Sequence, residues 1–305
     1  MPNAREIQSR IRSVQDTMKI TNAMYLISST KLRKARVKQE ESKTHFYTLR
    51  AMLDHILRHI PETENQYLDM REKKSRSERV GGYLVITADK GLAGAYNYDV
   101  LKLAKEQMEQ AGKTKLFVVG ESGRQYFTAK GVPIDEHFHY TAQNPTLHRA
   151  RIISAAVLDQ FLTGELDEVY LIYTRMKNSL SMEPEAFRLL PMKRQEIELK
   201  ELKDELYMQP NPKAVLDNIV PDAIRGYIYG ALVESYCCEQ NSRMMAMEAA
   251  NKSAKEMIRS LSMEYNRIRQ AMITQEITEV VAGAKAQKRK KQKKKREARP
   301  MSAGG

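Results

Sequence analysis

The segment AGKTK at residues 111–115 is the part of the sequence most similar to a phosphate-binding loop. Such a loop needs a glycine five positions before its Gly-Lys pair, because the backbone N–H groups between them cradle the phosphates. That position is Gln107, inside a segment that has the pattern of an amphipathic helix. We therefore interpret Gly112 as the C-cap of that helix rather than as part of a phosphate site.

A second glycine-bearing loop, TADKGLAGAYN at residues 87–97, follows an apolar, strand-like segment. Its glycines lack the spacing of a dinucleotide-binding or P-loop motif, and no acidic residue stands out as a ribose partner. A tight structural turn is favoured over a nucleotide cradle. The sequence predicts no cofactor.

Metal-binding and nucleophilic residues are equally sparse. His137, His139 and His148 lie in loop-like sequence without an HExxH motif or a cysteine partner, which favours surface side chains over zinc ligands. Cys237 and Cys238 are adjacent, and neighbours on a helix diverge by about 100°, so we expect no disulfide between them. Cys237 is predicted to face the helix seam and Cys238 to flank it. We expect no catalytic residue and no metal, and the chain by itself is not predicted to be an enzyme.

Positive charge is concentrated at the two ends of the chain. There are 51 Lys and Arg residues against 38 Asp and Glu, a formal net charge of +13. The block KLRKARVK at residues 31–38 is either a solvated helix face or a docking surface for acidic partner loops. Residues 285–305 hold ten Lys and Arg and one Glu, and they are predicted to be disordered. This tail has the charge to touch nucleic acid or anionic lipid, but it lacks aromatic residues for base stacking.

Two long helices must provide the framework for these groups. Neither Gly nor Pro occurs between Pro2 and Pro61, or between Gly230 and Gly283. Residues at 3-4 spacing in both runs predict a left-handed coiled coil in which the two helices pair antiparallel. The first seam comprises Ile7, Ile11, Val14, Met18, Thr21, Tyr25, Ser28, Leu32, Ala35, Gln39, Ser42, Phe46, Leu49, Leu53, Ile56 and Ile60. The second comprises Val233, Cys237, Gln240, Met244, Met247, Asn251, Ala254, Ile258, Leu261, Tyr265, Ile268 and Met272.

Between these runs, short apolar segments alternate with amphipathic ones. Strands are predicted at 81–89, 115–120, 167–176 and 185–192, and helices at 100–112, 121–131 and 147–163. This order predicts a small, mainly parallel sheet with crossover helices. The fold class is therefore α/β plus a long antiparallel coiled coil. No run approaches the roughly 18 apolar residues of a membrane-spanning helix, and the N-terminus lacks the apolar stretch of a secretory signal.

The predicted elements divide the chain into four parts. Residues 1–60 are the N-terminal coiled-coil helix, and residues 61–213 are a central Rossmann-like α/β domain with connectors, among them the polar segment 193–213. Residues 214–286 are the C-terminal coiled-coil helix, and residues 287–305 are the basic disordered tail.

A family resemblance is carried by five segments. They are IRSVQDTMKITNAM (11–24), KLRKAR (31–36), TADKGLAGAYN (87–97), CEQNSRMMAMEAANKSA (238–254) and NRIRQAMITQEITEVVAGA (266–284). Together they resemble the gamma subunits of the rotary, F-type ATP synthase. The loop departs from the family's common SDRGLCGGYN at Ala88, Lys90, Ala93 and Ala95. The family generally ends near Ala286, so the following residues are an addition.

The resemblance implies a non-catalytic rotor that couples ion flow through a membrane sector to ATP synthesis or hydrolysis. The implied partners are a hexamer of alternating alpha and beta subunits around the coiled coil, the epsilon subunit, and a membrane-embedded ring of c subunits. The implied location is peripheral, on the cytoplasmic side of the cell membrane. One asymmetric shaft favours a different conformation in each of three catalytic subunits, so its rotation would cycle each site through binding, reaction and release.

The same resemblance implies contact residues. Those that would face acidic loops of beta are Met24, Lys31, Arg33, Lys34 and Arg36. Those that would hydrogen-bond the hexamer are Arg243, Arg269, Gln270, Thr274 and Glu276. Val280, Val281 and Ala282 would lie in an apolar bearing. Each position is also compatible with an ordinary exposed or seam residue, and both interpretations stay open here.

Two other functions stay open on sequence alone. One is a basic-tailed coiled-coil protein that binds nucleic acid, with an affinity that falls steeply as salt rises. The other is a nucleotide-using enzyme housed in residues 80–192, which would bind ATP or NAD saturably.

Overall fold

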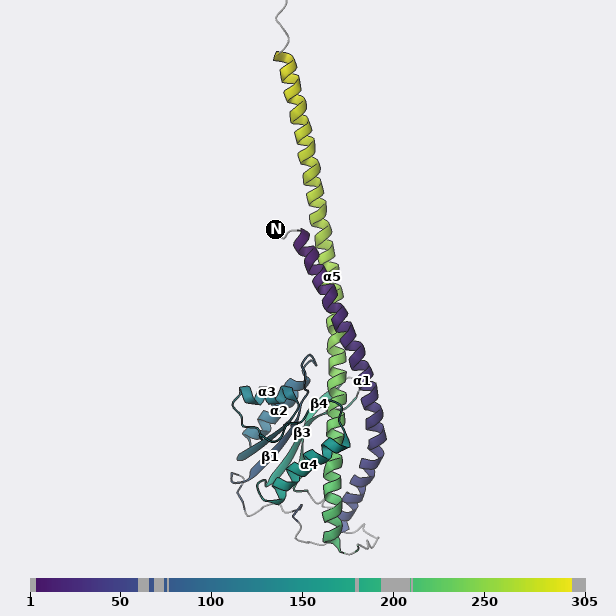
Figure 1. Ribbon diagram of the computed structural model, residues 1–305, viewed down its shortest axis with the longest axis vertical. Helices are drawn as coiled ribbons and strands as arrows, with labels where there is room; N and C mark the ends of the chain where they lie inside the picture. Colours follow the sequence, from purple (N-terminus) through teal and green to yellow (C-terminus); the bar gives the residue numbers. More distant parts are fainter. Residues whose placement is uncertain are drawn as a thin grey trace, which may run out of the picture. The chain divides into compact units, whose positions relative to one another are not determined.

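The structure is a computed structural model that describes residues 4–59, 66–68, 74–75, 77–178, 181–192, 209 and 211–297. Its elements follow the order α1 (Ala4–His59), β1 (Val80–Ile86), α2 (Tyr96–Glu109), β2 (Lys113–Val119), α3 (Glu121–Ala129), α4 (Leu147–Leu162), β3 (Glu168–Met176), β4 (Met182–Leu190) and α5 (Pro212–Glu297). The chain divides into two compact units, one of residues 24–247 and one of the described residues before 24 and after 247. Figure 1 labels these elements along the chain. Residues of both α1 and α5 belong to each of the two units.

The larger unit is built around a four-stranded sheet in the order β2-β1-β3-β4. β1 pairs in parallel with β2 and β3, whereas β4 lies antiparallel to β3 at the edge. The prediction of a mainly parallel sheet is therefore confirmed. Strand ends differ from the predicted ones by up to three residues: β1 ends at Ile86, and β4 begins at Met182, which pairs with Met176.

The two faces of the sheet are covered by different helices. Successive side chains of a strand point to opposite faces, so Tyr83 and Val85 pack with α2 and α3, while Leu84 and Ile86 pack with α4, α1 and α5. Both sets are almost fully buried. This two-sided burial explains why the parallel strands are nearly continuous apolar runs rather than alternating ones.

The helix bounds correct the expectations for two residues considered above, Gly112 as a helix cap and His148 as a loop residue. α2 ends at Glu109 with Gln110 as its C-cap, so the interpretation of Gly112 as the cap is wrong, and Gly112 lies in the turn before β2. α4 begins at Leu147, which places His148 in its first turn; the Thr146 hydroxyl accepts a hydrogen bond from the Arg149 N–H at 3.2 Å and caps this helix.

The predicted antiparallel pairing of the terminal helices is confirmed. In the larger unit, Leu32 and Ala35 of α1 pack against Val233 and Cys237 of α5. In the smaller unit, the Thr21 hydroxyl donates a short hydrogen bond to the Asn251 amide oxygen. Seam residues with described side chains are buried or half-buried throughout α1, and in α5 from Val233 to Ile268.

α5 is longer than predicted at both ends. It begins at Pro212, before the predicted start at 214. The helix also contains Pro221, which removes one backbone hydrogen bond. The helix continues through this proline because the apolar side chains around it, such as Val220 and Ile224, are fully buried and stabilise it by packing. At the other end the helix continues to Glu297, so the prediction of disorder is wrong for residues 287–297. No Gly or Pro interrupts this stretch, and Lys and Arg are good helix formers. Residues 298–305 and nearly all of the predicted connector 193–213 lie outside the described residues.

Candidate functional site

The basic block on α1 exposes its charges and buries its apolar residues. Lys31, Arg33, Lys34 and Arg36 are exposed, whereas Leu32 and Ala35 between them face α5. Met24, one further predicted contact residue, is half-buried. The block is therefore held rigidly by its own seam residues while it presents four cations outward. Whether acidic loops of a partner bind there stays a prediction.

Residues 231–243 of α5 are enclosed on all sides within the larger unit. Each of them is buried or half-buried, because one face packs on α1 and the other packs on the α/β domain. The adjacent cysteines illustrate this: Cys237 packs in the seam with Leu32, and Cys238 packs with Ala88, Ala93 and Tyr96. Burial raises the pKa of the Cys237 thiol to about 12 and raises the pKa of the Cys238 thiol further. Both thiols are therefore protonated and unreactive at neutral pH.

α5 fills the place where doubly wound sheets bind their ligands. In such sheets the binding crevice lies at the carboxyl ends of the strands, where the strand order reverses. Here the last pair of β1 and β3 is Val85 with Ile172, and β3 continues beyond it. The Thr174 N–H then donates to the Ser235 hydroxyl of α5 at 3.4 Å, and the Met176 N–H donates to the Glu234 carboxylate at 3.1 Å. α5 therefore occupies the crevice in which such a sheet would otherwise bind a ligand.

The loop after β1 is fixed to α5 by hydrogen bonds from a buried arginine of that helix. The Arg243 guanidinium lies 2.6 Å from the Glu239 carboxylate and donates to the carbonyls of Lys90 at 2.9 Å and Gly91 at 3.1 Å. Both charged side chains are almost fully buried. Positive φ angles at Leu92 (60°) and Gly94 (56°) turn the loop tightly. Arg243, predicted to bind the hexamer, is engaged within its own chain; its role toward a partner stays a prediction.

Ser242 adds a second link between this loop and α5. Its hydroxyl donates to the carbonyl of Ala93 at 2.7 Å. Sequence reasoning did not single out Glu234, Ser235, Glu239 or Ser242. The one available signal was the i, i+4 spacing of Glu239 and Arg243, which is that of an ion pair on a predicted helix.

The other predicted contact residues lie on an exposed part of α5 in the smaller unit. Every residue from 269 to 291 is exposed, including Arg269, Gln270, Thr274, Glu276, Val280, Val281 and Ala282. Met272, predicted as a seam residue, is 46% exposed, which corrects that prediction: the described part of its partner helix α1 begins only at Ala4. Ile273, Ile277, Val280 and Val281 are also exposed, and at 100° per residue these four form an apolar group on one side of the helix. Apolar side chains gathered on a surface indicate a contact with another protein.

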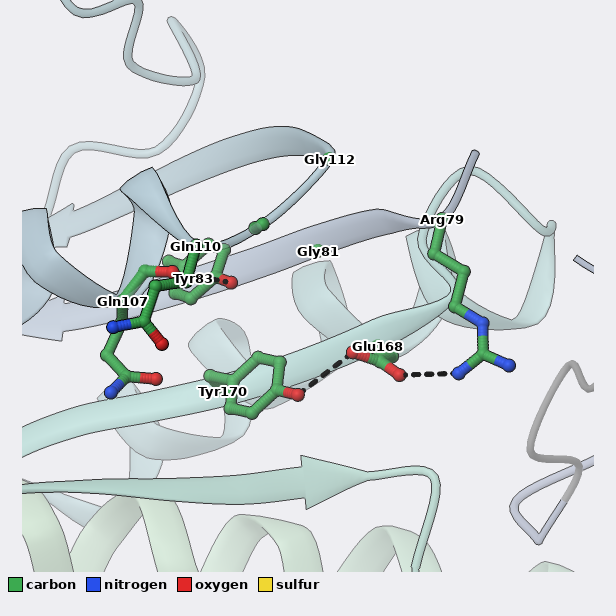
Figure 2. Close-up of a pocket in the computed structure, with 9 residues that line it drawn as sticks. Arg79, Gly81, Tyr83, Gln107, Gln110, Gly112, Glu168 and Tyr170 are labelled. Carbon is green, nitrogen blue, oxygen red and sulfur yellow. Dashed lines mark hydrogen bonds and ion pairs between the residues drawn. The ribbon is translucent and has the colours of Figure 1, made fainter. Parts of the chain in front are cut away.

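A polar hollow lies at the opposite, amino-terminal edge of the strands, between β1, β3 and the end of α2 (Figure 2). Glu168 stands at its centre, with its carboxylate 3.0 Å from Arg79 and accepting a hydrogen bond from the Tyr170 hydroxyl at 2.9 Å. Burial, followed by Glu168, raises the pKa of Tyr170 to about 12. The cavity volume of about 60 Å³ is far below the roughly 300 Å³ at which ligand sites begin, so a nucleotide does not fit.

The described part of the chain has neither a metal-binding cluster nor a membrane-spanning helix. Among those residues, no three His, Cys, Asp or Glu side chains are grouped so that they could hold a metal ion. No helix there is both long and apolar enough to cross a bilayer.

Comparison with known sequences gives matches along nearly the whole chain. A family described as "ATP synthase" matches residues 3–287. The ATP synthase gamma chain of Ruminiclostridium cellulolyticum is 41% identical over 291 residues, covering 93% of this chain and 98% of that one. A protein described as "ATP synthase gamma chain, sodium ion specific", from Acetobacterium woodii, is 35% identical over 302 residues, covering 93% and 98%.

Comparison with solved structures shows the same fold. A chain from the Euglena gracilis mitochondrial ATP synthase, in a structure of its OSCP/F1/c-ring, has a TM-score of 0.68 at 17% identity, covering 99% of this chain and 98% of that one. A chain from the central stalk and c-ring of the Tetrahymena thermophila enzyme has a TM-score of 0.56 at 22% identity, covering 76% and 99%.

Proposed function

The chain belongs to the family of ATP synthase gamma chains, and from that premise we propose that it works as the central shaft of an F-type rotary ATP synthase. It is a subunit of that membrane-associated complex. Its partners are the alpha and beta subunits of the hexamer, the epsilon subunit and the c-subunit ring. We infer that it carries no catalytic residue and that it reaches the cytoplasmic face of the cell membrane through these partners.

The observation that carries this proposal is the continuous framework from the sheet into the coiled coil. A shaft must pass torque from the domain that is driven to the helices that push on the catalytic subunits. Ser235 and Glu234 bind the end of β3, Arg243 and Ser242 bind the loop after β1, and the opposite face of α5 packs on α1. Because these links are hydrogen bonds between α5 side chains and backbone groups of the sheet domain, together with buried packing, relative rotation of sheet and helix would break many contacts at once.

The predicted contact surfaces fit this role. The basic block 31–36 would push electrostatically on acidic loops of beta, since its exposed cations sit on a helix fixed by buried neighbours. The exposed apolar group around Val280 and Val281 would turn inside an apolar collar of the hexamer, where directional bonds would otherwise favour one angle. Each asymmetric contact would favour a different conformation in each of the three catalytic subunits. Rotation of the shaft would therefore change, in each subunit in turn, which conformation is most populated.

A reversible crosslink tests the proposal. A cysteine replaces exposed Arg33, and a second cysteine is placed on the facing loop of one beta subunit in the assembled complex. Oxidation should abolish ATP turnover coupled to ion pumping, and a reductant should restore it. Cys237 and Cys238 do not interfere, because both are buried.

The matched control carries the Arg33→Cys substitution alone and is oxidised in the same way. It should keep its coupled activity, since no second thiol is within reach. Coupled pumping that persists in complexes verified to be fully crosslinked would contradict a rotating shaft. The comparisons give no support to the nucleic-acid-binding alternative. For the nucleotide-binding alternative, α5 fills the crevice of the sheet in the described part of the chain, and the hollow beside Glu168 is too small for a nucleotide.

A further inference from the structure

The last part of α5 goes beyond what the family shares. The family match ends at residue 287, and the two relatives compared above are covered almost completely while about 7% of this chain is left over. The helix nevertheless continues without interruption to Glu297. Residues 285–297 contain nine Lys and Arg and one Glu; we call them the basic rod.

The charge of the basic rod surrounds the helix axis. Its cations are Lys285, Lys288, Arg289, Lys290, Lys291, Lys293, Lys294, Lys295 and Arg296. At 100° per residue, those with described side chains, Lys285 and residues 288–291, leave no gap wider than about 100° around the axis. The rod therefore has no neutral face. Like charges at i, i+4, such as Lys285 and Arg289, repel each other, so the helix is favoured where anions lie close around it.

This distribution argues against three other partners. A flat anionic membrane would meet only half of the charges, and the rod has no apolar residue larger than Ala286 to insert. A further coiled-coil helix would need an apolar seam, which is absent from the rod sequence. Single-stranded nucleic acid would need aromatic residues for stacking, and the rod has none.

We propose that the basic rod lies inside a collar of carboxylates contributed by the stationary subunits that surround the C-terminal end of the shaft. This inference rests on the proposed function. A rod that is equally positive on every side meets a ring of acidic side chains with nearly the same energy at every angle. It would therefore hold the shaft in place axially without opposing its rotation, whereas one charged face would favour a single angle.

A charge-removal variant tests this in the assembled complex. All nine cations of the rod are replaced by Gln, which has a helix propensity close to that of Lys. The matched control replaces the seven lysines by Arg and so conserves the charge. At about 0.1 M salt the Gln variant should leave the complex about tenfold faster than the wild type, while the Arg control should not. At about 1 M salt, where the screening length falls to about 3 Å, all three should dissociate at the same rate.

A second measurement identifies the partner chemistry. A carbodiimide, which joins amines to neighbouring carboxylates, should link lysines of the rod to Asp or Glu side chains of stationary subunits, and mass spectrometry should locate the bonds. Equal dissociation rates at low salt, or links only within this chain, would overturn the inference. It would also be overturned if the assembled complex bound duplex DNA or phosphatidylglycerol vesicles through the rod.

The same preparations separate this inference from the proposed function. If the Gln variant and the wild type both assemble and couple ATP turnover to pumping, and their dissociation rates depend on salt in the same way, only the proposed collar of carboxylates is contradicted. If the wild type does not assemble with alpha and beta at all, the shaft itself is wrong.

Discussion

Two segments of the same helix, residues 231–243 and residues 269–291 of α5, have opposite environments. In the first, every side chain is buried or half-buried between α1 and the sheet domain; in the second, every described side chain is exposed. Both contain apolar residues and both contain arginine. The difference teaches that one continuous helix performs two tasks: the enclosed segment holds the chain together, and the exposed segment is available to other subunits.

The largest contrast should come from two arginines. Arg243→Ala leaves the Glu239 carboxylate buried without its cation and should destabilise the chain by about 3–5 kcal/mol. Arg269→Ala removes an exposed side chain and should change stability by less than about 0.5 kcal/mol. Urea unfolding of the two purified variants measures both values. Similar losses at the two positions would show that the enclosed segment does not anchor the chain.

The enclosed and exposed segments of α5 can also be compared through the same Val→Ala substitution in each. Val233 is 1% exposed and Val280 is 72% exposed. Val233→Ala should cost about 2 kcal/mol in unfolding free energy, because two buried methyl groups are lost and a cavity remains. Val280→Ala should leave stability within about 0.5 kcal/mol of the wild type.

The order of the two valine variants should reverse when assembly is measured. Val280→Ala should weaken retention of the shaft in the hexamer, and Val233→Ala should not once it is folded. If Val280→Ala left retention unchanged, the exposed apolar group would have no bearing role.

Alkaline pH should lower the free energy of unfolding through the buried Cys237 thiol of the enclosed segment. The Cys237 thiol has a pKa of about 12 in the folded chain against an ordinary value of 9.0, so the folded state keeps a proton that the unfolded state releases. Stability is therefore unaffected below pH 9 and falls as pH rises from there toward 12. Between pH 9 and 10 the loss from this thiol should be about 1 kcal/mol.

Denaturation of Cys237→Ala and the wild type at both pH values measures this slope. The fall in stability should be smaller in the variant by about that amount. A Val280→Cys chain supplies the contrast, because its added thiol is exposed and should not steepen the wild-type slope. Parallel slopes for Cys237→Ala and the wild type would argue against a buried, protonated Cys237.

The smallest effect concerns the seam between the two segments. The Thr21–Asn251 hydrogen bond should contribute about 1 kcal/mol or less. A double-mutant cycle with Thr21→Val and Asn251→Ala isolates this coupling energy. A coupling energy near zero would mean that the polar pair does not help to fix the register of the helices.

The 3-4 spacing of apolar residues made the coiled coil predictable, but it did not show where the partner helix ends. The 3-4 spacing identified seam residues from Ile7 to Ala35 and from Val233 to Ile268, because heptad burial is a local consequence of helix geometry. It failed at Met272, which has the right spacing but no described residue of α1 opposite it. High charge predicted disorder for residues 287–297, whereas the structure has a helix there.

The contacts that join the sheet to α5 could not be predicted in the same way. Ser235, Ser242 and Glu234 are ordinary polar residues of a predicted helix, and their partners are backbone groups at the ends of distant strands. Their role depends on where α5 crosses the sheet. Arg243 shows the same dependence, since the motif in which it lies does not reveal that its guanidinium binds the loop after β1.

The sequence by itself determined which segments are helices or strands and which residues repeat along one face, because hydrophobic spacing and the absence of Gly and Pro act locally. Only the tertiary structure decided that the ligand crevice of the sheet is filled by α5, and that one part of that helix is enclosed while another is exposed. The burial of a side chain depends on which other parts of the molecule pack against it. Val233 and Val280 have the same intrinsic helix propensity and hydrophobicity, yet one is buried and the other is exposed.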